Sequence, residues 1–334
     1  MKKELLLSFF CGTVIPLLIV AGASLRPGGE VAPDPTAPPG PAAADTEAAS
    51  VPTQPALSDA DFDLEVLTQD GETERMDLES YLTGVVLAEM PASFHPEALK
   101  AQAVVARTYT CRRMGQQRHE TAAVCTDPGC CQAFRSKEDY VAAGGLEEDA
   151  EKVLSAVRET AGQVLTYEGA LIDATYFSCS GDFTEDAVEV WGQEVPYLRA
   201  VESPGEEDAP RFREEQSFSP EQFCALTGVE GRGPVQTWFS EPDRTEGGGV
   251  EQMEICGRRF TGQELRRLLG LRSAAFTVEV REGQIVVETR GFGHRVGMSQ
   301  YGAEAMAREG RLCGEILAHY YQGTQLERLS QYGT

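Results

Sequence analysis

The sequence predicts an α+β fold in which helices and short antiparallel strands follow each other irregularly. An alanine-rich stretch on either side of Pro91 has the pattern of two consecutive helices. Residues 277–293 instead alternate as a β-hairpin that turns at Glu282-Gly283. No regular strand–helix–strand order links the elements, which favours α+β over a doubly wound parallel sheet.

Residues 1–26 form an apolar segment with a basic start and no charge between Glu4 and Arg26. Its 21 uncharged residues, at about 1.5 Å each, would span roughly 31 Å, enough to cross a bilayer core. The basic start predicts that the amino end stays in the cytoplasm and that the remainder is exported. We therefore expect a single-pass anchor in the cell membrane, although Ala21-Gly22-Ala23 also fits a signal-peptidase site and leaves cleavage open.

Residues 27–58 are rich in proline and alanine and lack the large apolar side chains that a core needs. Because such composition favours extended, solvated chain, we predict a disordered spacer here. The globular domain is expected over residues 59–330. It begins with a strand that contains Phe62, Leu64 and Val66.

The helix pair covers residues 77–110. Asp77 can cap the first helix, and Pro91 should end it near Glu89 or Met90, because proline disfavours the helical conformation of the residue before it. Pro96 suits the first turn of the second helix, where a missing N–H costs nothing.

Glu89 follows an apolar run from Val85 to Ala88 at the end of the first helix. A carboxylate in such surroundings is poorly solvated, so its pKa should rise, and a protonated acid could then serve as a proton donor near neutral pH. The alternative is that Glu89 is simply a polar residue at a helix end.

The net charge of −24 and the isoelectric point near 4.6 argue against a nucleic-acid partner, which needs a basic surface. The stretch between Glu97 and Glu120 is an exception, because it has five basic residues and no acidic one. This patch suits an anionic ligand, or else it is an ordinary solvated face. Its members are Lys100, Arg107, Arg112, Arg113 and Arg118.

His119, Cys125, Cys130 and Cys131 form the most specific local cluster. One imidazole and three thiols can supply the four ligands of a tetrahedral Zn²⁺ site, and the intervening turn residues would let the chain wrap the ion. Such a zinc would be structural, because no position stays open for water. A disulfide from Cys125 to Cys130 or Cys131 is the alternative in an exported chain.

Further elements follow from hydrophobic periodicity and turn signals. Between residues 203 and 249 we expect acidic loops around one short helix at 220–226. The other expected elements are a helix at 147–160, strands at 163–167 and 171–178, a helix containing Leu265, Leu268 and Leu269, and helices at 300–308 and 313–321.

Two segments could bind a polar ligand. Tyr176, Ser178 and Ser180 lie where a strand gives way to a turn, which is a good place to present hydroxyl groups to a ligand. Trp191, nearby in the sequence, could offer an aromatic face to a sugar, or it could be part of the core. The glycine-rich segment 289–307 lacks the spacing of a nucleotide loop. Its His294 could be an acid/base group or a hydrogen-bond donor, or a buried, satisfied histidine.

Three blocks together resemble the stage II sporulation protein D family, which are lytic transglycosylases of endospore-forming bacteria. The blocks are YLTGVVLAEMPASFHPEALKAQAVVARTY, then FSCSGDFTEDAVEVWG with PYLRAV, and finally RGFGHRVGMSQYGAEAMA with ILAHYYQGT. The resemblance spans about residues 61–328, and a related branch is called amidase enhancer. It implies a catalytic domain, for which we expect two lobes and a central cleft.

Residue by residue, the resemblance implies a catalytic role for Glu89 and substrate positioning by Arg107 and Tyr176. Members with a zinc site use a His-x5-Cys-x4-His-Cys pattern, which this chain resembles with Cys130 in place of the second histidine. A second departure is Cys179-Ser180-Gly181-Asp182, where the family usually has hydroxyl residues and paired glycines. The other substrate contacts that we expect are Lys100, Ser178, Ser180, His294, Gln300 and Tyr301.

The resemblance implies cleavage of peptidoglycan glycan strands between N-acetylmuramic acid and N-acetylglucosamine, with the C6 hydroxyl as nucleophile and a 1,6-anhydro product. One carboxylate suffices for that reaction, whereas an ordinary glycosidase needs two. The resemblance also implies a role in engulfment on the mother-cell side of the septum, with an amidase, stage II sporulation protein P, and a membrane protein, stage II sporulation protein M, as partners. One alternative is a non-catalytic glycan-binding or amidase-stimulating module. Another is a zinc-dependent peptidase or amidase, but the thiolate-rich ligands argue against it, because hydrolytic zinc sites usually use histidines and carboxylates.

Overall fold

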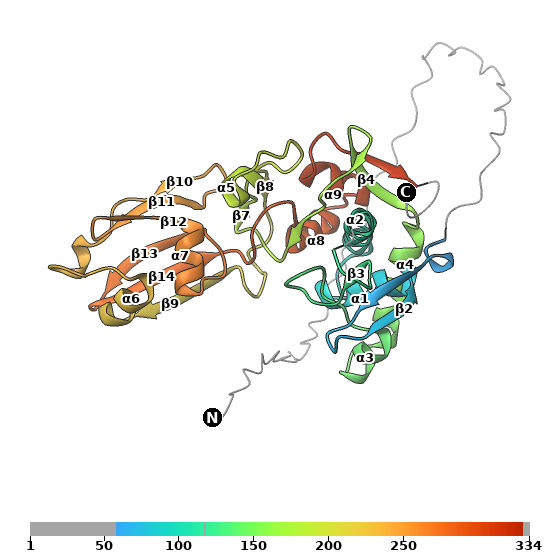
Figure 1. Cartoon of the computed structure of the whole chain (residues 1–334). Helices are drawn as coiled ribbons and strands as arrows, with labels where there is room; N and C mark the ends of the chain where they lie inside the picture. Colours follow the sequence, from blue (N-terminus) through green and yellow to red (C-terminus); the bar gives the residue numbers. More distant parts are fainter. Residues whose placement is uncertain (1–57, 117, 330–334) are drawn as a thin grey trace, which may run out of the picture. The chain divides into compact units, whose positions relative to one another are not determined.

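The computed structural model describes residues 58–116 and 118–329 (Figure 1). The anchor predicted over residues 1–26 lies outside this range, as does the linker predicted over 27–58 apart from Ser58. Within the described part of the chain, no helix has the length and apolar character of a membrane span.

The described chain opens with a 3₁₀ turn (Asp59–Asp61) and an antiparallel hairpin of β1 (Asp63–Leu67) and β2 (Thr73–Asp77). The helix pair follows as predicted, with α1 over Leu78–Glu89 and α2 over Pro96–Met114. Asp77 caps α1 by accepting the Ser80 N–H at 2.8 Å. The break before Pro91 therefore places Glu89 at the last position of α1.

Helix α2 lies at the centre of the larger apolar core (Figure 1). Four of its alanines have no exposed surface, and side chains this small allow neighbouring elements to approach closely: Ala98, Ala101, Ala103 and Ala106. The elements packed against it are α1, α4 (Glu147–Glu159), α8 (Gln300–Arg308), α9 (Cys313–Tyr320) and β4 (Gln163–Tyr167).

The carboxyl-terminal part of the chain pairs with the middle part. Strand β15 (Met298–Ser299) pairs in parallel with β6 (Tyr176–Phe177), and β16 (Gln325–Arg328) pairs with β4. The strand expected over 171–178 is therefore divided, because β5 (Ala170–Leu171) pairs with β4 instead. The β6–β15 pairing brings Tyr176 beside the start of α8.

Residues 213–290 have an apolar core of their own, which includes Phe223, Ile285 and Val287. The predicted hairpin is present, and Glu282 and Gly283 both have positive φ in its turn. Its strands are β13 (Phe276–Arg281) and β14 (Gln284–Arg290), and β14 also pairs with β9 (Arg213–Phe218). A second sheet contains β10 (Asp243–Arg244), β11 (Val250–Ile255) and β12 (Arg258–Thr261), and the helices are α6 (Pro220–Thr227) and α7 (Gly262–Leu269) (Figure 1).

Strand β9 corrects the prediction that residues 203–249 are loops around one helix, because it pairs with β14 along its whole length. The short helix itself is confirmed as α6. The remaining short elements are β3 (Val124–Cys125), α3 (Lys137–Ala142), β7 (Asp182–Phe183), α5 (Ala187–Trp191), β8 (Glu202–Ser203) and a 3₁₀ turn at Val235–Thr237.

Candidate functional site

Glu89 is half-buried at the end of α1. Its Oε1 accepts the Ala133 N–H at 2.8 Å, and the carboxylate also has a hydrogen-bonding contact with Tyr176. Burial raises its pKa above the usual range, and these hydrogen bonds offset only part of that effect. Within the described residues Glu89 forms no ion pair, so its local surroundings favour a protonated acid, as the apolar run predicts.

Tyr176 is held against Glu89 by a glutamine that sequence reasoning missed. The Tyr176 hydroxyl donates to Gln132 Oε1 at 3.2 Å, and Gln132 Nε2 donates to Thr110 Oγ1 at 3.1 Å. Gln132 is buried, so α2 and β6 fix its amide from two sides. Burial and the nearby Glu89 raise the pKa of Tyr176 well above its usual range, so the phenol stays protonated.

Gln300 lies on the other side of Glu89, at the start of α8. Its amide is close enough to favour the charged form of Glu89, yet Nε2 is buried and has no well-formed hydrogen bond within the described residues. A buried donor without a partner is costly. The nearest acceptor for this donor is the Glu89 carboxylate itself, so the contact of Gln300 with substrate stays a prediction.

The four side chains of the His/Cys cluster lie close enough together to hold one metal ion. The four donor atoms lie within 4.8 Å of one another, and His119 Nε2 is 3.4 Å from Cys131 Sγ and 3.8 Å from Cys130 Sγ. A tetrahedral zinc with bonds of about 2.0–2.3 Å requires donor separations of roughly 3.5–3.8 Å. All cysteines among the described residues are free thiols, so neither alternative disulfide is formed in this structure.

The loop that carries the cluster also reaches Glu89. Asp127 forms its turn, since the Asp127 carbonyl accepts the N–H groups of Cys130 and Cys131 at 3.0 and 2.8 Å. The next two residues are Gln132 and Ala133, which contact Tyr176 and Glu89. Their position directly after Cys131 was the one sequence signal that could have identified them.

Comparison with known proteins identifies relatives that match most of the chain. A family model described as "Stage II sporulation protein" matches residues 68–167. "Stage II sporulation protein D" of Bacillus amyloliquefaciens is 37% identical over 285 residues, which cover 84% of this chain and 83% of that protein. The protein of the same name from Bacillus subtilis (strain 168) is 38% identical over 272 residues, covering 79% of this chain and 78% of that protein. The chain belongs to the stage II sporulation protein D family.

The chain also has a weaker similarity to a protein with a different name. "Amidase enhancer" of Bacillus subtilis (strain 168) is 29% identical over 301 residues, which cover 73% of this chain and 40% of that protein. The similarity extends over most of the chain, although the amidase enhancer is longer.

Arg107 corrects an expectation taken from the resemblance to the stage II sporulation protein D family. Its side chain has no exposed surface, and Nη2 and Nε lie 2.6 and 3.0 Å from Asp59 Oδ2. Nη2 also donates to the Val157 carbonyl at 3.0 Å. A guanidinium enclosed in this way cannot contact a glycan, so Arg107 joins the amino-terminal turn to the core instead.

The basic patch is largely neutralised. Lys100 Nζ lies 2.8 Å from a Glu97 oxygen and 2.7 Å from a Glu159 oxygen, and these partners raise its pKa. Arg112 and Arg113 both lie within 4 Å of Asp173 Oδ1. The prediction that these cations await an anionic ligand is therefore not supported by their contacts.

The hydroxyl cluster of this family member is only partly available to a ligand. Ser180 is fully buried, with its hydroxyl and N–H donating to Glu206 at 2.8 and 2.6 Å, so its predicted contact with substrate is wrong. Ser178 is half-buried, and its carbonyl accepts the Tyr301 N–H at 3.0 Å. The Tyr301 ring packs edge-on against Phe94, at 5.0 Å between centroids.

His294 is a neutral, hydrogen-bonded ring. Its Nδ1 accepts the Val296 N–H at 3.1 Å, and it also has a hydrogen bond with the backbone of Tyr176. Burial lowers its pKa to about 4, with a smaller contribution from the charge of Arg266. His294 is thus uncharged near pH 7 and positions the Tyr176 strand, as in the satisfied-histidine alternative, rather than transferring protons.

Sequence reasoning also missed a buried ion pair between Arg295 and Glu185, at 3.0 Å. Arg295 donates further to the carbonyls of Ser180, Phe183 and Gly247 at 2.6–2.7 Å. These bonds tie the segment around Gly247 to the residues that follow β6, so their role is structural.

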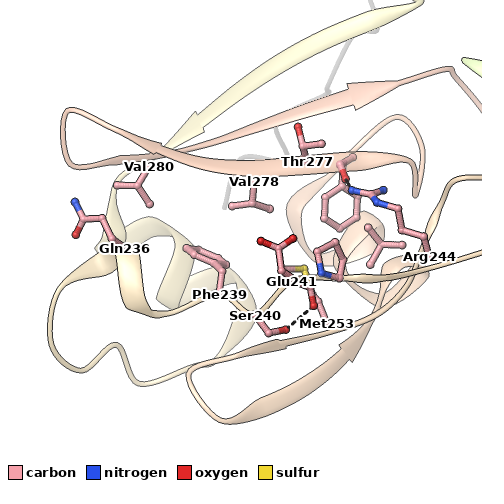
Figure 2. A pocket seen from close by; sticks show the side chains of 12 residues that line it. Gln236, Phe239, Ser240, Glu241, Arg244, Met253, Thr277, Val278 and Val280 are labelled. Atoms are coloured by element: carbon pink, nitrogen blue, oxygen red, sulfur yellow. Dashed lines mark hydrogen bonds between the residues drawn. The ribbon is translucent and has the colours of Figure 1, made fainter.

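A cavity of about 330 Å³ lies in the β-rich segment, lined by residues from Gln236 to Val280 (Figure 2). Figure 2 shows Phe239, Met253 and Val278 around the cavity, and the acidic residue Glu241 also lines it. Glu89 does not line this cavity. It contains no pair of proton-transfer groups, so we do not assign the chemistry to it.

Proposed function

We propose that this protein is a peptidoglycan lytic transglycosylase that acts in sporulation, with Glu89 as its acid and base. The observation that carries the proposal is the half-buried Glu89, which bonds to Ala133 and contacts Tyr176 and whose pKa is raised by burial. A lytic transglycosylase needs only this one carboxylate, whereas a hydrolytic glycosidase needs two. The names of the relatives support a sporulation role and a relation to amidases.

The mechanism needs two proton transfers, one from Glu89 to the leaving group and one from the nucleophile back to Glu89. The Ala133 N–H occupies Oε1 of Glu89, so the acidic proton belongs on Oε2, from which it passes to the glycosidic oxygen as the C1–O bond breaks. The muramic acid C6 hydroxyl then bonds to C1 and returns its proton to Glu89. N-acetylglucosamine leaves with a new hydroxyl, and the other product is the 1,6-anhydro sugar.

Neighbouring residues can hydrogen-bond to the Glu89 carboxylate during this cycle. Tyr176 remains protonated, and its one hydroxyl proton can turn from Gln132 to the carboxylate between the two steps. Gln300, at the start of α8, can stabilise the same carboxylate with its amide. We propose that glycan strands lie across these residues in a cleft between two lobes, which stays a prediction.

Mass spectrometry of digested glycan strands, stripped of their stem peptides, tests this function. We expect fragments that end in 1,6-anhydro-N-acetylmuramic acid. Fragments with a reducing end, which are heavier by one water, would indicate hydrolysis. No cleavage, together with stimulation of an amidase, would favour the non-catalytic module that the match to an amidase enhancer suggests.

The rate should depend on pH in a direction set by Glu89. Because only the protonated acid starts the reaction and burial raises its pKa, kcat should be level at low pH. It should fall by about tenfold per pH unit above that pKa. Measurement of kcat between pH 5 and 9 checks this, and a rate that rises steadily over the range would contradict the role of Glu89.

We further propose that His119, Cys125, Cys130 and Cys131 hold one structural Zn²⁺, which the nearness of their donor atoms and their ligand types support. The ion would supply a rigid support for the loop ahead of Gln132 and Ala133. Cys130→His, which recreates the family ligand, should retain one zinc per chain by elemental analysis. Cys130→Ser should lose the zinc and unfold at a temperature about 5 °C lower, because metal binding adds to the free energy of folding. If neither variant contained zinc and both unfolded at the same temperature, the zinc site would be contradicted.

The cellular setting is also proposed. A single-pass anchor in residues 1–26 would hold the domain outside the cytoplasm, on the mother-cell side of the septum. Stage II sporulation proteins P and M remain proposed partners. Fractionation of cells that express the full chain, and affinity capture with the domain, would test the anchor and the partners separately.

A further inference from the structure

Trp191 is a large aromatic side chain that the core does not use. It is 45% exposed, although it is the last residue of α5 and lies within the described domain. Gly192 follows it with φ of 73° and ends the helix in the left-handed conformation that favours glycine. The chain thus turns directly after the ring and leaves it at the surface.

The ring is nevertheless held in place. Its centroid lies 5.4 Å from that of His294, at an angle of 55° between the planes, and His294 also packs against Phe177 at 5.7 Å. His294 in turn bonds to the backbone of Tyr176, whose hydroxyl lies beside Glu89. Trp191 is therefore connected to the residues around Glu89 through His294 and Tyr176.

The surroundings of Trp191 fit a sugar better than a protein partner. Glu189, Gln193 and Glu194 are exposed next to it, and their oxygens can accept hydrogen bonds from hydroxyl groups. A pyranose ring needs this combination, because one face carries C–H groups that pack on an aromatic plane while its edge carries hydroxyls. Protein interfaces instead deplete charged residues around their central aromatic anchors.

We propose that Trp191 is a stacking platform for an N-acetylated pyranose of the glycan strand, at a subsite next to the one where Glu89 acts. The inference rests on the proposed function and names one place where the strand is bound. It predicts that loss of the ring weakens glycan binding while the proton-transfer group is intact.

The chain offers a direct readout, because it contains two tryptophans and the other, Trp238, is only 7% exposed. The experiment titrates tri-N-acetylchitotriose into the Glu89→Gln protein, so that no cleavage interferes. We expect a blue shift of the emission as the sugar covers Trp191. The same titration of Trp191→Phe, which retains Trp238 as its reporter, should show no shift.

Affinity is measured in the same background by calorimetry. Trp191→Ala should bind the trisaccharide about 5–10-fold more weakly, Trp191→Phe should retain most of the affinity, and the matched exposed control Val188→Ala should be unchanged. Unchanged affinity of a folded Trp191→Ala protein would overturn the subsite and leave the ring for a protein contact. These readouts use no catalysis, so they can fail while cleavage by the unmodified chain still supports the proposed function.

Discussion

Replacing Glu89 with glutamine should lower the rate of anhydro-sugar release by on the order of 10²–10⁴-fold, because the amide has the shape of the acid but cannot donate or accept the proton. The glutamine carbonyl can still accept the Ala133 N–H. The loop that follows the His/Cys cluster should therefore stay in place. Liquid chromatography with mass spectrometry of the digested strands measures the effect.

The same substitution has a predicted effect on stability with a definite sign. The folded-state pKa of Glu89 is raised, so the folded chain holds its proton to higher pH than the unfolded chain does. Stability is lost as pH rises through that window, and above it the buried charge is a cost. Glu89→Gln should thus be at least as thermally stable as the unmodified protein at pH 7.

Glu79→Gln is a matched control for this experiment. Glu79 lies in the first turn of the same helix and pairs with Arg158 at 2.8 Å, away from the Glu89 end. We expect it to leave cleavage unchanged. Retained cleavage by Glu89→Gln, or equal loss by both variants, would contradict the assignment of Glu89.

The parts of the site that could be predicted from sequence are those fixed by short-range chemistry. Pro91 ends α1 one turn after an apolar run, so the position and the poor solvation of Glu89 follow from a few adjacent residues. The close spacing of His119 to Cys131 likewise places four donor atoms together without knowledge of the rest of the chain.

The parts that could not be predicted depend on pairings between distant segments. Arg107 and Lys100 share a helix face, but Arg107 pairs with Asp59, which lies 48 residues away in the sequence, and Lys100 pairs with Glu159. Strand β9 has one large apolar residue, Phe218, and exists because β14 pairs with it. The role of Gln132 depends on its hydrogen bonds to Thr110 of α2 and Tyr176 of β6, which only the folded chain brings together.

The correction at Arg107 leads to the second large expected effect, which is on folding. Arg107→Met should destabilise the domain by about 3–5 kcal/mol, because it removes the guanidinium of a buried ion pair and the hydrogen bonds that this guanidinium makes. Asp59 is 1% exposed, and its Oδ2 lies 2.6 Å from the Arg107 guanidinium. For a domain of this size the unfolding midpoint should drop by roughly 5–10 °C, measured by calorimetry or circular dichroism.

A double variant separates this structural role from the substrate role that the family resemblance implies. Asp59→Asn in the Arg107→Met background removes the buried carboxylate that Arg107 faced, so it should recover part of the lost stability, since part of the penalty comes from that buried negative charge. If Arg107 instead bound glycan, the single variant would keep its unfolding midpoint and lose affinity for tri-N-acetylchitotriose, and Asp59→Asn would restore nothing. Because the guanidinium has no exposed surface, we expect the trisaccharide affinity of the refolded double variant to match that of the unmodified chain.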